Sequence, residues 1–168
     1  ADRSDPAERF VAEMNRTAAR IGLAGTTFRN PHGLSVDGHR STAADLVRLA
    51  AAALKHDRFR EVVSTRLYGC TVEGDGGYRR NLRWENTNQL LGVAGYGGVK
   101  TGTTDAAGAC LVSLGTCPAA EGGSSSADRR LIVAVLGSTS PDARYVDTRN
   151  LFRWAWRELA RAEEQVSE

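Results

Sequence analysis

The chain has 168 residues, of which 41% are hydrophobic and 25% charged, and its formal net charge is +2. These values fit one globular domain or most of one, and so small a charge gives no reason to expect a nucleic-acid partner. No apolar run approaches the roughly 20 residues that span a bilayer. No signal peptide opens the chain, as in any mature or truncated secreted protein.

The three cysteines are widely spaced, which excludes a disulfide framework and a zinc knuckle. We expect buried free thiols, with a Cys70–Cys117 pair as the alternative. His32, His39 and His56 occupy loop and helix-end positions, and we expect turn and cap roles for them rather than a metal site or a catalytic base. No cofactor is expected.

The first part of the chain predicts helices. Ser4-Asp5-Pro6 is a helix start, and apolar residues at spacings of three and four continue that helix to a stop at Gly22. Residues 28–38 are rich in Asn, Pro, Gly and Asp, which indicates a loop. Ser41 or Thr42 then caps a second helix, with Asp45 near its third position, and a short helix is expected over 57–63.

Strand patterns follow. Residues 67–72 and 78–84, separated by a glycine-rich turn over 73–77, predict a hairpin. Residues 97–103 are expected to be extended, and 109–114 and 131–136 are apolar strands joined by a Gly/Ser-rich loop over 121–128. Pro141-Asp142 starts a last helix, whose apolar side is predicted to hold Val146, Leu151, Trp154 and Leu159. Helices, then antiparallel strands, then a closing helix predict an α+β fold with an antiparallel sheet covered by helices.

Lys100 stands out chemically. The 22 basic residues include only two lysines, Lys55 and Lys100, and Lys55 sits at a helix end where any cation would serve. Lys100 begins Lys100-Thr101-Gly102-Thr103 on an expected strand edge. An ammonium group, a hydroxyl, a bare backbone and a free N–H together suit an anionic substrate and an oxyanion. The alternative is a hairpin edge with a solvated lysine.

The flanking motifs resemble those of the penicillin-binding serine D-alanyl-D-alanine carboxypeptidases over nearly the whole chain. The resemblance implies the C-terminal portion of a β-lactamase/transpeptidase-like fold, with residues 1–168 forming one incomplete domain. It rests on several motifs in the family's order and spacing: Phe10–Asn15, Phe28–Leu34, His39–Leu46, Asn86–Leu91 and Gly98–Gly108.

The resemblance also implies roles for individual residues. Lys100 and Thr103 take the catalytic positions: the lysine supplies electrostatics and proton transfer, and the Thr103 N–H contributes to an oxyanion hole. Thr101, Gly102 and Arg144 take the substrate-binding positions, with Thr101 and Arg144 at the terminal carboxylate. The implied substrate is a peptidoglycan stem peptide ending in D-Ala-D-Ala, outside the cytoplasm, and the intact parent would also bind β-lactams.

The chain departs from the family at the nucleophile. No serine has a lysine three residues on, and none has an asparagine two residues on, so both Ser-x-x-Lys and Ser-x-Asn are absent. We expect the chain to start just after the Ser-x-Asn loop, with a missing N-terminal fragment or a swapped homodimer completing the domain. The alternative function is a non-catalytic peptide-binding module. A phosphate-binding loop is disfavoured, because Val99 stands where that loop has glycine.

Overall fold

The computed structural model describes residues 5–117 and 129–166. It confirms the predicted order of helices, antiparallel strands and a closing helix, and the predicted loop over 121–128 lies outside the described residues. The elements are α1 (Pro6–Arg20), α2 (Ala43–Ala53), α3 (Asp57–Ser64), β1 (Leu67–Glu73), η1 (Asp75–Gly77), β2 (Arg79–Glu85), η2 (Gln89–Gly92), β3 (Tyr96–Thr104), β4 (Gly108–Cys117), β5 (Arg129–Ser138) and α4 (Ala143–Val166).

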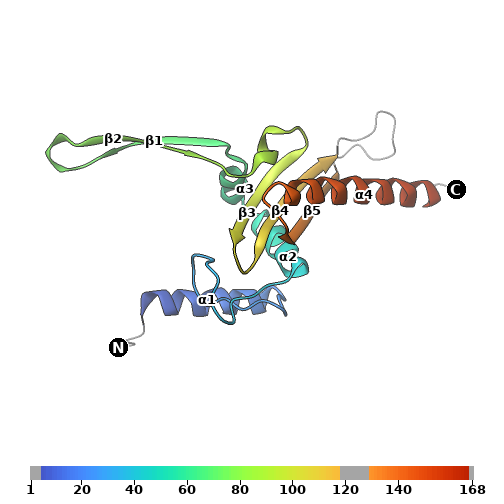
Figure 1. The fold of residues 1–168 in the computed structure, drawn as a ribbon, viewed down its shortest axis with the longest axis horizontal. Helices are drawn as coiled ribbons and strands as arrows, with labels where there is room; N and C mark the ends of the chain where they lie inside the picture. The colour runs from blue at the N-terminus through green and yellow to red at the C-terminus, as the bar shows by residue number, and fades with distance from the viewer. Residues whose placement is uncertain (1–4, 118–128, 167–168) are drawn as a thin grey trace.

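The strands form two antiparallel sheets rather than one. β3, β4 and β5 pair in that order, while β1 and β2 form a separate two-stranded hairpin that extends away from the three-stranded sheet (Figure 1). Tyr68 and Trp84 face each other across this hairpin and stack with ring centroids 6.0 Å apart, although at least half of each side chain is exposed. The hairpin therefore contributes little to the core.

Helices cover both faces of the three-stranded sheet. Successive side chains of β4 point to opposite faces. Gly115 faces Phe152 of α4, whereas its neighbour Leu114 lines a cavity with Ala51 and Leu54, at the end of α2. Helix α3 packs against β3. One face thus carries α4 and the other carries α2 and α3, as the prediction of a helix-covered sheet requires.

The predicted helix caps are confirmed. Asp5 accepts a hydrogen bond from the Ala7 N–H at 3.1 Å ahead of Pro6, and Thr42 accepts one from the Asp45 N–H at 3.1 Å. Each oxygen satisfies an N–H that has no partner within its own helix. Both helices accordingly begin within two residues of the predicted positions.

The predicted apolar side of α4 was wrong. Val146, Leu151, Trp154 and Leu159 are exposed, and the buried side of the helix instead carries Tyr145, Thr148 and Phe152. These three residues follow a spacing of three and four and so share one face, whereas the predicted set is spaced by five, three and five and does not. The sheet selects the face on which Phe152 reaches Gly115, and the four predicted apolar residues, Trp154 among them, are left outside.

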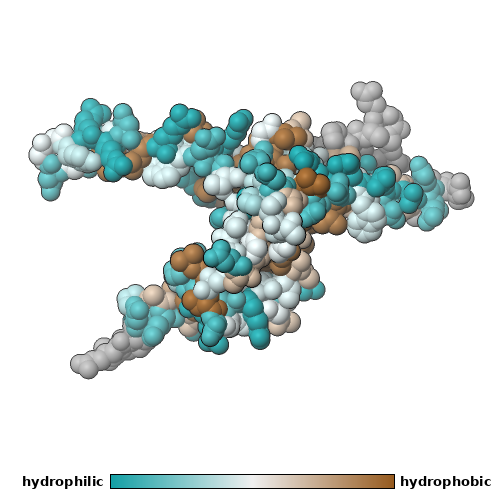
Figure 2. Space-filling model, in the orientation of Figure 1, coloured by the Kyte–Doolittle hydropathy of each residue, from teal (hydrophilic) through white to brown (hydrophobic). Residues whose placement is uncertain are grey.

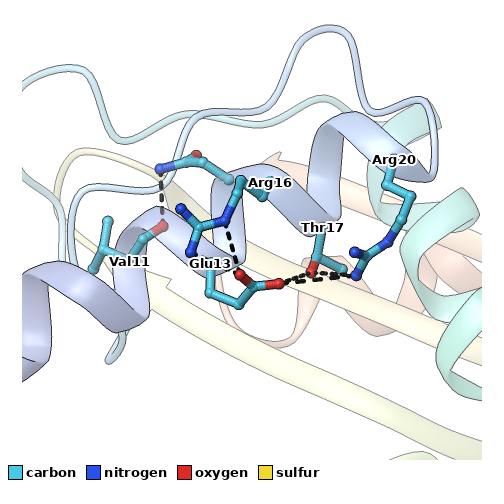
Figure 3. Close-up of polar contacts among 6 residues, drawn as sticks. Val11, Glu13, Arg16, Thr17 and Arg20 are labelled. Atoms are coloured by element: carbon cyan, nitrogen blue, oxygen red, sulfur yellow. Dashed lines mark hydrogen bonds and ion pairs between the residues drawn. The ribbon is translucent and has the colours of Figure 1, made fainter.

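Hydrophobic surface is not confined to α4. Figure 2 shows brown patches both around the sheet and around α1, and Phe10 and Leu34 are 58% and 62% exposed. The polar face of α1 is organised around Glu13, whose carboxylate accepts hydrogen bonds from Arg16 and Thr17 and lies 4.0 Å from Arg20 (Figure 3). Within the described ranges, no helix is long and apolar enough to cross a membrane.

Candidate active site

The Lys-Thr-Gly segment lies on a sheet edge, because among the described strands β3 pairs only with β4. Lys100 and Gly102 are exposed, whereas Thr101 between them is 6% exposed. A Cβ added at Gly102 would meet nothing within 4 Å. The edge is therefore open to a ligand at Gly102.

The two faces of the sheet contribute different groups to this edge. Lys100 is paired with Val112 and Thr101 with Leu111, so Lys100 projects to the face that carries α2 and α3, and Thr101 to the face that carries α4. The Lys100 ammonium donates to the Thr101 carbonyl of its own strand. Lys100 is exposed, and two cavities of about 410 and 260 Å³ elsewhere in the described structure are lined by other residues.

Arg144 lies against the end of the same strand, although more than forty residues separate them in the sequence. Its Nη1 donates to the Gly102 carbonyl at 3.3 Å, to Thr103 Oγ1 at 3.0 Å and to the Cys110 carbonyl at 3.5 Å. The side chain is buried, and its Nε has no hydrogen-bond partner among the described residues. The tertiary structure thus brings Arg144 to the Lys-Thr-Gly strand. From the sequence alone, Arg144 is only a residue at the start of the last helix.

Two further residues join this cluster that the sequence analysis did not single out, Thr87 and Tyr145. The Thr87 hydroxyl lies 2.6 Å from that of Thr101, and the Tyr145 hydroxyl donates to the Thr87 carbonyl at 3.0 Å. The same Tyr145 oxygen accepts from Arg144 Nη2 at 3.3 Å and from the Gln89 N–H at 3.3 Å. In the sequence, only the positions of these residues were a clue: Thr87 lies inside the Asn86–Leu91 motif, and Tyr145 directly follows Arg144.

The loop that carries Asn30-Pro31-His32-Gly33-Leu34 reaches the far end of β3. Asn30 closes this loop by donating to the Leu34 carbonyl at 2.8 Å and accepting from the Gly33 N–H at 2.8 Å. The next residue, Ser35, places its hydroxyl 2.8 Å from that of Thr104. The Asn30–Leu34 motif, which was predicted to fix a loop, therefore does so, and the loop lies beside the candidate site.

Two of the three histidines take part in turns. His32 Nδ1 accepts from the Leu34 N–H and His39 Nδ1 from the Arg29 N–H, which are turn roles. His56 precedes α3 but makes no side-chain cap bond. In the part of the chain that the structure describes, no three His, Cys, Asp or Glu side chains gather as metal ligands, and all three cysteines are free thiols, partly rather than fully buried.

Comparison with known proteins supports one family. The D-alanyl-D-alanine carboxypeptidase family profile matches residues 4–140. A D-alanyl-D-alanine carboxypeptidase of Streptomyces is 36% identical over 149 residues, which are 88% of this chain and 48% of the relative. A D-alanyl-D-alanine carboxypeptidase of Escherichia coli is 35% identical over 152 residues, covering 89% of this chain and 34% of the relative. The chain thus spans half or less of the length of these relatives.

Solved structures give the same answer for the fold. The crystal structure of a Streptomyces DD-transpeptidase matches with a TM-score of 0.80 at 32% identity, covering 94% of this chain and 58% of that one. A penicillin-binding protein of Listeria monocytogenes, in its cefotaxime-bound form, matches with a TM-score of 0.67 at 33% identity, covering 88% and 55% of the two chains. These matches confirm the predicted partial β-lactamase/transpeptidase-like fold.

Proposed function

The chain belongs to the D-alanyl-D-alanine carboxypeptidase family, and from this premise we propose that its protein is a serine D-alanyl-D-alanine carboxypeptidase. It removes the terminal D-alanine of peptidoglycan stem peptides through an acyl-enzyme. The observation that carries the proposal is the convergence, at one open strand edge, of an exposed lysine, an uncovered glycine and a buried arginine: Lys100, Gly102 and Arg144.

The substrate's free carboxylate is assigned to the end of β3. The Arg144 guanidinium supplies positive charge there, held against the strand by its hydrogen bonds to the Gly102 carbonyl and Thr103 Oγ1. We assign the Thr101 hydroxyl as a second donor to the same carboxylate. Gly102 lets the peptide lie close to the backbone, since a Cβ at that position points into open space.

The reacting carbonyl is assigned to the stretch from Lys100 to Thr103. In the proposed reaction a serine hydroxyl attacks the carbonyl of the penultimate D-alanine, and the Thr103 N–H stabilises the oxyanion that forms. The peptide C–N bond breaks, and the terminal D-alanine leaves as a free amino acid after its nitrogen takes a proton. Water then hydrolyses the serine ester. Lys100 supplies a positive field and takes part in proton transfer. Because no Ser-x-x-Lys occurs in the 168 residues, we assign the serine to a segment outside this sequence.

Fluorescent penicillin tests the proposal, because a β-lactam acylates the same serine and leaves a stable covalent adduct. The full-length gene product that contains this chain is expected to become labelled in proportion to added drug, and the isolated chain is expected to stay unlabelled. Intact-mass measurement then counts one adduct per protein. A full-length product that carries no adduct and releases no D-alanine from a D-Ala-D-Ala peptide would remove the enzymatic proposal.

The absence of Ser-x-x-Lys also supports a second candidate, a module that binds stem peptides without cleaving them. This alternative keeps the groups around Lys100 and Arg144 but needs no nucleophile. Calorimetric titration with a D-Ala-D-Ala peptide separates the two. Binding by a full-length product that releases no D-alanine favours the module, and release of D-alanine favours the enzyme.

The exposed apolar side chains of α1 and α4 support a covering partner, which we propose to be a missing N-terminal fragment or a swapped homodimer. Phe10 and Trp154 are 58% and 57% exposed, a state unfavourable for large apolar groups in water. Light scattering of the isolated chain distinguishes a monomer from a dimer. We also place the protein outside the cytoplasm, secreted, periplasmic or membrane-anchored in the parent, where its proposed substrate is.

A further inference from the structure

We infer that Thr87 is a positioning residue that directs the single hydroxyl proton of Thr101 toward the substrate carboxylate. The inference rests on the proposed function and adds to it a residue that lies behind the Lys-Thr-Gly strand. The starting observation is the 2.6 Å contact between the Thr87 and Thr101 hydroxyl oxygens. At that distance one of the two hydroxyls must donate and the other must accept.

The direction of that hydrogen bond decides whether Thr101 can bind a carboxylate. A hydroxyl has one proton and two acceptor lone pairs. If Thr101 donated to Thr87, no proton would remain for an anion. If Thr87 donates to Thr101, the Thr101 proton is free and its oxygen is held in place. An ionised carboxylate accepts only, so a bound substrate selects the arrangement in which Thr87 donates.

The backbone of Thr87 is fixed by the residue that follows Arg144. The Tyr145 hydroxyl donates to the Thr87 carbonyl at 3.0 Å while accepting from Arg144 Nη2 and the Gln89 N–H. Tyr145 is itself buried beside Leu90 and Leu111. The Tyr145 hydroxyl donates its one proton to the Thr87 carbonyl and accepts two hydrogen bonds. It therefore joins α4 to the segment around Thr87, and the Thr87–Thr101 contact extends this network to β3. Arg144 and Thr101, the two groups assigned to the carboxylate, are therefore connected through Tyr145 and Thr87.

The test compares isosteric substitutions in the full-length protein. Thr87→Val removes the hydroxyl and keeps the side-chain shape, and Thr87→Ser restores a hydroxyl. We expect Thr87→Val to raise KM for a D-Ala-D-Ala peptide up to about tenfold, because the hydrogen bond that holds the Thr101 oxygen is lost and tenfold is the upper scale of one net hydrogen bond. The value of kcat should change less than twofold, and Thr87→Ser should return KM to within about twofold of the parent.

Thr148→Val is the matched control. Thr148 is fully buried on α4, and its hydroxyl has no hydrogen-bond partner among the described residues, so the same substitution should leave both KM and kcat unchanged. An unchanged KM in Thr87→Val, or an equal loss in Thr87→Val and Thr87→Ser, overturns the inference. Failure of the parent to acylate or turn over any substrate refutes the proposed enzyme instead, so the two failures are distinguishable.

Discussion

Phe152 of α4 lies directly over Gly115 of β4, so closely that a Cβ built at position 115 would come within 2.4 Å of its ring. Phe152 is 1% exposed and also packs edge to face against Tyr96, with ring centroids 5.4 Å apart. This contact fixes the distance between α4 and the sheet, and with it the position of Arg144 at the start of the helix.

Gly115→Ala should therefore destabilise the fold. The added methyl group cannot fit without moving the ring or the helix, and overpacking of this kind costs about 1–3 kcal/mol. Thermal unfolding of the chain measures the loss. Gly69→Ala is the control, because its Cβ would meet only the Leu82 carbonyl at an ordinary 3.5 Å. Equal unfolding temperatures for the two variants would contradict the close contact.

Asp45→Ala should destabilise the packing of the first loop against α2. Asp45 is buried, and its Oδ2 accepts from the Gly25 N–H and the Thr26 hydroxyl, both at 2.8 Å. Leaving these partly buried donors unpaired costs about 2–4 kcal/mol. Chemical denaturation measures the change. The exposed Asp37→Ala should have almost no effect, and a comparable loss there would show that burial is not the cause.

Glu13 should titrate below the usual range of glutamate. The hydrogen bond and charge of Arg16 lower the pKa of its carboxyl, with smaller contributions from Arg20 and Thr17 (Figure 3). A folded-state pKa below the unfolded one gives stabilisation that is complete above the unfolded pKa and is lost as pH falls through the folded pKa. NMR of the Glu13 side-chain carboxyl carbon as a function of pH measures the midpoint of this titration. Arg16→Gln should move the midpoint upward, and an unmoved one would contradict the assignment.

Lys100→Ala should abolish most penicillin acylation without affecting folding. The side chain is exposed and its hydrogen bond goes to the carbonyl of the next residue, Thr101, so the unfolding temperature should change little. If Lys100 acts on the reacting carbonyl as proposed, loss of its charge should slow acylation about 10²–10³-fold in the full-length protein. The control is Lys55→Ala, which removes the other lysine. Unchanged acylation in Lys100→Ala would remove that residue from the mechanism.

Arg144→Ala should affect both stability and substrate binding. The guanidinium donates to the Gly102 and Cys110 carbonyls and to Thr103, so its loss should cost about 1–3 kcal/mol of folding free energy. KM should rise more than kcat falls, because we assign the Arg144 charge to binding the substrate carboxylate. Steady-state kinetics and thermal unfolding measure the two effects, with exposed Arg149→Ala as the control. A normal KM would contradict the carboxylate assignment.

The sequence by itself determined the local structure and the chemistry of one strand. Capping residues such as Thr42 and the periodicity of apolar residues act within a few positions, so the helix starts and the strands were predictable. The ordered motifs between Phe10 and Gly108 indicate the family from the sequence alone.

Only the tertiary structure decided which face of α4 is buried, because that helix carries apolar residues on more than one side and the fit of Phe152 over Gly115 chooses between them. It also placed Arg144 against Gly102 and joined Thr87 to Thr101. These contacts connect residues far apart in sequence, and no local pattern specifies them.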